Sequence, residues 1–147
     1  MMKRCRCGQD MDITLRTIVH ARSIEVLHVP VYTCSSCGHS ELMPEIKKDV
    51  IEIMKDVYNA EASDRTTIYF EERHELASVL KECLESGGND SDLVQVIEQV
   101  LNERVNHLLD IYLLAKTCGD AAWTEDIERR LKQISCFRSN PFEVKIS

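Results

Sequence analysis

Cys5-Arg6-Cys7-Gly8 and Cys34-Ser35-Ser36-Cys37-Gly38 are the two stretches that decide how the N-terminal part of the chain folds. Each stretch brings two thiols together in one tight turn, and a glycine follows each second cysteine. Glycine permits the left-handed backbone that turns amide groups back toward the sulfur atoms. Two pairs of thiolates match the tetrahedral shell of a structural zinc ion. We therefore predict a zinc site here.

Other interpretations of the cysteines remain open at this stage. The four could form disulfides, although nothing marks a secreted chain. The first pair is C-x-C, a strained spacing, so a histidine could replace one cysteine; the candidates are His20, His28 and His39. The remaining cysteines fall on apolar positions of helical patterns and are predicted to be buried: Cys83, Cys118 and Cys136.

The segment between the cysteine pairs has the period of β-strands. Apolar and polar residues alternate over residues 13–18 and 26–31, which predicts two or three antiparallel strands with a turn near residues 21–23. This pairing brings both cysteine pairs to the same end of the sheet. Pro30 cannot donate a ladder hydrogen bond, so its strand is predicted to be an edge strand or a bulged one.

With these features, residues 1–54 resemble the YgiT-type zinc finger, the amino-terminal domain of MqsA-type antitoxins. The matching features are the paired cysteines, the strand 24–32 that leads into Cys34, and an acidic helix that opens at Pro44. In that family the unit binds zinc structurally and holds a ribonuclease toxin. The resemblance implies an antitoxin-like function and these zinc ligands: Cys5, Cys7, Cys34 and Cys37. The family usually has C-x-x-C in both places and a helix-turn-helix afterwards, which we do not find here.

The rest of the chain has helical patterns. Pro44 opens an amphipathic helix of roughly sixteen residues, and a second helix is predicted from about Arg65 to Ser86. After the breaker at residues 87–92, apolar residues repeat at helical spacing from Leu93 to Lys116. Gly119 and Asp120 then end that helix and cap a last one, whose inner stripe includes Trp123.

These patterns predict an α+β protein in which a small zinc-bound antiparallel β unit precedes an all-α region. The predicted parts are a zinc-binding β domain at residues 1–43, a helical domain at 44–137 and an extended tail at 138–147. The helix Leu93–Lys116 is predicted to form the spine of a bundle and could also join two copies in a homodimer. Residues 108–134 weakly resemble the IDEAL motif, a helical hairpin that implies no known chemistry.

Charge indicates the class of partner. Residues 1–43 carry five Lys or Arg against four Asp or Glu, residues 44–147 carry thirteen against twenty-one, and the whole chain has net charge −7. An acidic chain favours a basic protein partner and disfavours nucleic acid. Near the thiolates, Lys3, Arg4 and Arg6 are predicted to balance their negative charge. We find no signal peptide and no apolar run that could span a membrane, and expect a cytoplasmic protein.

The sequence contains none of the common catalytic motifs, and four cysteine ligands leave no open position on zinc. We therefore predict a non-enzymatic, zinc-binding regulatory or adaptor protein, antitoxin-like, that acts through protein–protein interaction. One alternative is a DNA-binding transcriptional regulator. Another is a redox-switched zinc protein with chaperone-like activity, because the cysteine spacing is similar to the zinc centre of redox-controlled holdase chaperones.

Overall fold

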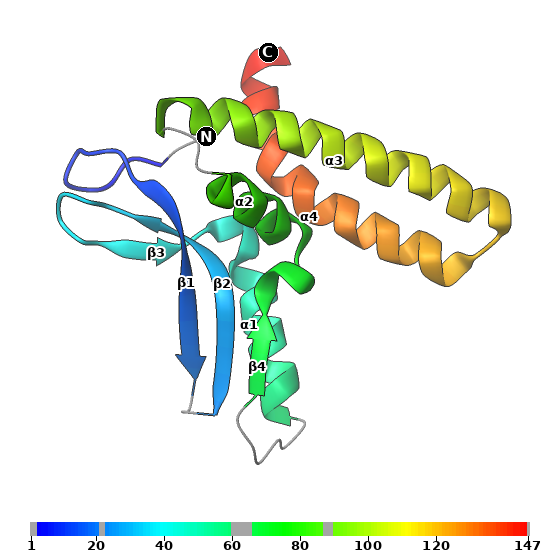
Figure 1. The fold of residues 1–147 in the computed structure, drawn as a ribbon, viewed down its shortest axis with the longest axis horizontal. Coiled ribbons are helices and arrows are strands. Elements are labelled where there is room, and N and C mark those ends of the chain that lie inside the picture. Colours follow the sequence, from blue (N-terminus) through cyan, green and yellow to red (C-terminus); the bar gives the residue numbers. More distant parts are fainter. Residues whose placement is uncertain (1–2, 21–22, 60–65, 87–89, 147) are drawn as a thin grey trace.

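The computed structural model describes residues 3–20, 23–59, 66–86 and 90–146 and has the predicted α+β architecture (Figure 1). An N-terminal sheet is followed by helices, two of which form a long hairpin that extends to one side (Figure 1). In chain order, the elements are β1 (Asp12–His20), β2 (Ile24–Thr33), β3 (Ser40–Leu42), α1 (Pro44–Asn59), β4 (Thr66–Tyr69), the 3-10 turn η1 (Phe70–Glu72), α2 (Glu75–Glu85), α3 (Asp90–Cys118) and α4 (Ala121–Ile146).

Strand β2 is the centre of the sheet. Strand β1 pairs antiparallel with it, from Asp12 opposite Thr33 to His20 opposite Ile24. On the other edge of β2, β3 pairs antiparallel with its end and β4 pairs parallel with its beginning. Because β1 begins where β2 ends, the cysteine turns that precede β1 and follow β2 lie at the same end of the sheet, as predicted.

The prediction that Pro30 lies in an edge strand is wrong, because β2 lies between β1 and the other two strands. The alternative prediction, a bulged strand, is confirmed. The strand is not an edge strand, but it is bulged: the register with β1 shifts between Arg16 and Ile18, and β2 contains the extra residue. His28 lies in this bulge with φ 62°. Pro30 follows at a point where β4 has ended and β3 has not begun, so its missing N–H is not needed on that edge.

The helix predicted from Arg65 to Ser86 is wrong in its first part. Arg65 lies outside the described residues, and Thr66–Tyr69 forms strand β4, followed by η1 and then α2. Threonine, isoleucine and tyrosine favour extended backbone, and the open edge of β2 supplies a partner that buries Ile68 to 5% exposure. The short strand β3 is a further element that the sequence did not predict.

The buried apolar side chains form one cluster that runs from the sheet into the helices. It includes Val26 and Val29 of β2, Phe70 of η1, Leu80 of α2 and Ile127 of α4, each with no exposed surface. Helices α1 and α2 both contact β2. The parts predicted as domains 1–43 and 44–137 therefore share one sheet and one core.

Helices α3 and α4 form an antiparallel hairpin whose turn was predicted. Gly119 has φ 71°, and the N–H groups of Gly119 and Asp120 donate to the carbonyls of Lys116 and Ala115 at 3.1 Å each. The carboxylate of Asp120 then accepts the N–H of Trp123 at 3.0 Å and caps α4.

The lengths of these two helices differ from the prediction. Helix α4 continues to Ile146, so the extended tail predicted from residue 138 is wrong; Pro141 lies inside the helix, a position that is disfavoured for proline but not excluded. Three leucines on α3 are exposed, Leu109, Leu113 and Leu114, and the homodimer through this helix stays a prediction.

Among the described residues, no helix combines the length and apolar character needed to cross a membrane.

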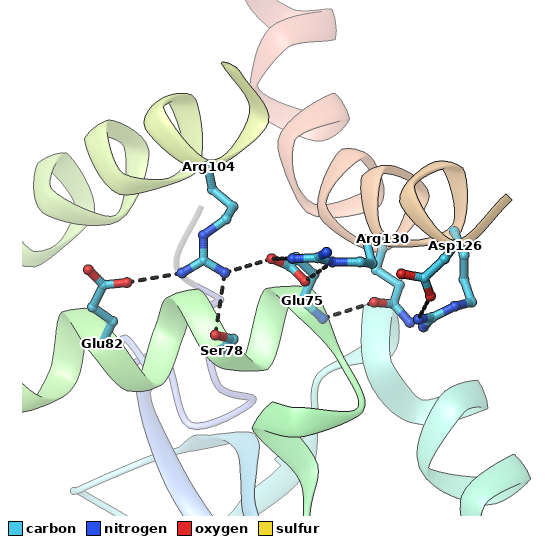
Figure 2. A network of polar contacts seen from close by, with 8 residues as sticks. Glu75, Ser78, Glu82, Arg104, Asp126 and Arg130 are labelled. Carbon is cyan, nitrogen blue, oxygen red and sulfur yellow. Dashed lines mark hydrogen bonds and ion pairs between the residues drawn. The ribbon is translucent and has the colours of Figure 1, made fainter. Parts of the chain in front are cut away.

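A buried carboxylate joins three helices (Figure 2). Glu75, at the start of α2, is 8% exposed. Its oxygens accept one hydrogen bond from Arg104 Nη1 of α3 at 2.7 Å and another from Arg130 Nε of α4 at 2.8 Å. The oxygen Oε1 of Gln133 on α4 accepts the backbone N–H of Glu75 at 2.9 Å. Burial raises the pKa of Glu75, but the two guanidinium groups outweigh it and hold the pKa below its ordinary value.

His74 ties α1 to the beginning of α2. Its side chain is 0% exposed, and its Nε2 lies 2.8 Å from Oδ2 of Asp49 on α1. The imidazole stacks on Phe70 with ring centroids 5.3 Å apart. The charged groups around it are Asp49, Glu75 of α2 and Arg129 of α4. Burial lowers the pKa of His74 and outweighs the opposing effect of Asp49.

This environment makes stability depend on pH. Because the folded-state pKa lies below the ordinary value of 6.5, the unfolded chain takes up the proton first as the pH falls. The contribution of His74 is therefore fully present above the unfolded-state pKa and is lost progressively below it. Urea unfolding from pH 7.5 to pH 5 should show a smaller decrease in the free energy of unfolding for His74→Gln than for the wild type. The exposed His107 provides the control, since His107→Gln should keep the wild-type slope. Equal slopes for His74→Gln and the wild type would contradict the assignment.

Candidate metal centre

Four cysteine sulfurs converge at one end of the sheet. The Sγ atoms of Cys5, Cys7, Cys34 and Cys37 all lie within 4.8 Å of one another. The closest pairs join the two turns, because Cys5 Sγ lies 3.5 Å from Cys37 Sγ and Cys7 Sγ lies 3.5 Å from Cys34 Sγ. The four side chains that the sequence predicts as ligands are thus together and could bind one metal ion.

The spacing of the sulfurs fits a tetrahedral metal site. A tetrahedron with metal–sulfur bonds of about 2.3 Å has sulfurs about 3.8 Å apart, within the range found here. The three histidines weighed as replacements have other neighbours: His28 Nδ1 lies 2.9 Å from Oε2 of Glu71, His39 Nε2 lies 3.1 Å from Oε2 of Glu41, and His20 faces the ring of Tyr58. Among the described residues, the cluster consists of cysteines alone.

The remaining cysteines lie away from this cluster. Cys83 of α2 is buried, as predicted, with 1% exposure. Cys118 is exposed at the end of α3, so the prediction that it is buried is wrong; it falls at the hairpin tip, where no neighbouring helix covers it. The prediction for the side chain of Cys136 lies outside the described residues.

Both cysteine turns are closed by backbone hydrogen bonds between residues three or four positions apart. The N–H of Gly8 donates to the carbonyl of Cys5, and the N–H of Gly38 donates to the carbonyl of Cys34, each at 2.9 Å. Gly8 has φ 95° and Gly38 has φ 77°, a left-handed backbone that favours glycine. Amide groups consequently point at sulfur: the Gln9 N–H at Cys7, and the His39 N–H at Cys37. The predicted role of the two glycines is confirmed.

The electrostatics of the cluster favour a bound cation. The N–H of Cys37 helps to lower the pKa of Cys34 to about 6. The N–H of His39 lowers the pKa of Cys37, but the adjacent thiols of Cys5 and Cys34 outweigh it and raise that pKa to about 11. One thiolate therefore forms readily and then resists the formation of others beside it. A divalent cation removes that resistance because it binds several thiolates at once.

The cluster has a buried side and an exposed side. Cys5 and Cys34 are 6% and 1% exposed and belong to the hydrophobic core, whereas Cys7 and Cys37 are exposed. A metal bound here would join the core of the sheet to its surface. Four sulfur ligands fill a tetrahedral shell, which is the arrangement of structural sites rather than of sites that bind a reacting water.

Two of the cations near the cysteine turns have carboxylate partners. Lys3 forms an ion pair with Glu41, and Arg4 Nε lies 3.8 Å from Oδ1 of Asp10. Both lysine and arginine therefore have carboxylate partners on the rim of the cysteine turns. The balance of the thiolates by these cations stays a prediction.

No family model, curated protein or solved structure matches the chain. The candidate metal centre therefore rests on the positions and chemistry of its own residues.

Sequence reasoning missed the second polar cluster, formed by His74, Glu75 and Arg104. One signal was present: Arg104 falls on the inner stripe of α3, between the buried Leu101 and Leu108. A cation on an apolar stripe requires a buried anionic partner. The sequence does not identify that partner, because Glu75 precedes Arg104 by twenty-nine positions.

Single cysteine replacements should show which thiols bind the metal. Cys34→Ser should lower bound metal from one ion per chain to well below one, since an alcohol is a poor ligand for soft metals. Cys118→Ser removes an exposed thiol outside the cluster and should keep full metal content. Elemental analysis of the purified chains measures both values. Equal metal content in the two variants would contradict the assignment.

Proposed function

We propose that this chain is a non-enzymatic, zinc-stabilised regulatory or adaptor protein that acts by binding another protein. The observation that carries the proposal is the convergence of four cysteine sulfurs within 4.8 Å at the tips of two turns. Thiolate ligands in tetrahedral arrangement favour zinc among the common divalent metals. In small zinc-binding units, metal binding contributes about 10 kcal/mol or more to folding.

A structural role for the metal supports binding rather than catalysis. When all four positions are taken by sulfur, the ion has no position left for an activated water. Cys5, Cys7, Cys34 and Cys37 would hold the two turns in a fixed relation, and the sheet would present a rigid surface. The net charge of −7 favours a basic partner, since opposite charges accelerate encounter.

An antitoxin-like role is the specific form of this proposal. It rests on the resemblance of residues 1–54 to the YgiT-type zinc finger, in which the zinc unit holds a ribonuclease toxin. The paired cysteine turns, the strand β2 between them in the chain and the helix α1 that follows are compatible with it. The partner would then be a basic nuclease, and the complex would form in the cytoplasm.

Affinity capture from the native host tests the proposal. The tagged, zinc-loaded chain and Cys118→Ser should each retain one dominant basic protein, and Cys34→Ser should lose it together with its zinc. Bound proteins are identified by mass spectrometry, bound nucleic acid by nuclease-sensitive staining, and zinc by elemental analysis.

Two results would contradict it. Nucleic acid as the main bound species would favour the DNA-binding regulator. Proteins captured only after oxidation and zinc release would favour the redox-switched protein, in which Cys7 and Cys37 would be the exposed thiols of the zinc site.

A further inference from the structure

Strand β1 forms an open edge of the sheet. It pairs with β2 on one side, and among the described residues no strand pairs with its other side. In an antiparallel ladder every second residue turns its N–H and its C=O away from the neighbouring strand, so β1 presents a row of these groups outward. With nine residues, Asp12–His20, the edge is longer than a typical strand of about five or six. It is long enough to accept a further strand.

The features that usually protect an edge strand are missing from β1. Its sequence contains no proline and no lysine. The extra residue of the bulge lies in β2, so the backbone of β1 stays regular. Between the two ends of the strand only Arg16 carries a charge. This edge therefore favours a strand that can place a carboxylate beside Arg16.

The two charged side chains of β1 are self-complementary. Asp12 and Arg16 are four residues apart and project from the same face of the strand. Both are exposed, and within the part of the chain that the structure describes neither takes part in an ion pair. When two copies of β1 pair antiparallel about Thr14, Asp12 of each copy lies directly opposite Arg16 of the other. Opposite charges in that position stabilise a strand pair.

Charge distinguishes this register from the adjacent ones. A pairing centred on Leu15 would place Asp12 opposite Ile18, and a pairing centred on Arg16 would place two arginines against each other. Of the three registers, only the one centred on Thr14 pairs Arg16 with a carboxylate.

The other face of β1 supports the same register. Ile13 is 3% exposed and belongs to the core, whereas Leu15, its neighbour on that face, is only partly buried. Pairing about Thr14 places Leu15 of each copy opposite Ile13 of the other. The pairing would therefore cover apolar surface that the single chain leaves partly exposed.

The distribution of charge favours self-association through the sheet. Residues 1–43 carry five Lys or Arg against four Asp or Glu, so these parts of two copies repel each other little. Residues 44–147 carry thirteen against twenty-one, and this excess of negative charge opposes contact between the helical parts of two copies.

We propose that the chain forms a homodimer in which two copies of β1 pair antiparallel about Thr14 and join the two sheets into one. The dimer contains two Asp12–Arg16 pairs and two Ile13–Leu15 pairs. It differs from the dimer that the sequence predicts through α3, and it does not depend on the proposed protein partner.

Analytical ultracentrifugation of the zinc-loaded full chain over a range of concentrations tests the proposal. The wild type should show a reversible equilibrium between monomer and dimer. Asp12→Arg places like charges opposite each other at two points and should weaken the dimer by on the order of tenfold. The charge-swapped variant Asp12→Arg/Arg16→Asp restores both pairs and should dimerise within about threefold of the wild type.

A matched control changes the same charge elsewhere. Asp110→Arg alters the net charge as Asp12→Arg does, but at an exposed site on α3, and should not weaken the dimer. Circular dichroism verifies that each variant is folded, and Arg16→Glu replaces Asp12→Arg if that variant does not fold.

An isotope-filtered NOE experiment on mixed labelled and unlabelled wild-type chains gives an independent result. It should show contacts between Asp12 of one copy and Arg16 of the other. A monomer at every concentration, no recovery in the charge-swapped variant, or contacts confined to other elements would overturn the proposal. A dimer that Leu113→Glu abolishes and Asp12→Arg leaves intact would overturn it in favour of the dimer through α3.

Discussion

Mutual repulsion among the thiolates that four clustered cysteines can form is the constraint on which the cysteine end of the sheet depends. The pairing of β1 with β2 forces the two cysteine turns together, and the glycines aim amide groups at the sulfurs. Hydrogen bonds from those amides favour one thiolate, but they do not offset the charge of several. A divalent cation bound to the four sulfurs would do so, and it would also fix the two turns against the core through Cys5 and Cys34. If the site binds such a cation, its removal should loosen this end of the sheet first.

Strand β2 carries that constraint to the rest of the molecule. It pairs with β1, β3 and β4, and both α1 and α2 contact it. From β4 the chain passes through η1 into α2, where Glu75 binds arginines from α3 and α4. The cysteine cluster and the helical hairpin are therefore connected through one sheet, one core and one buried carboxylate, although they lie far apart in the sequence.

The sequence was sufficient where the signal is local. Cysteine spacing, the proline at the start of α1 and the glycine after α3 each specify their own backbone, and the structure places them as predicted. It was insufficient where the outcome depends on a distant partner. Residues 66–69 have both helical periodicity and β-branched side chains, and only the open edge of β2 decides between them. The burial of His74 and Glu75 could not be predicted either, because it depends on α1, α3 and α4. The central position of β2 likewise depends on the distant strand β4.

The central claim is that the four cysteines bind a single zinc ion in a closed sulfur shell. X-ray absorption at the zinc edge, recorded on the protein as purified, measures this shell directly. The account predicts four sulfur neighbours at about 2.3 Å and no nitrogen or oxygen in the first shell. Nitrogen or oxygen scatterers at about 2.0 Å would show that a histidine, carboxylate or water completes the site, and would contradict the structural role assigned to the metal.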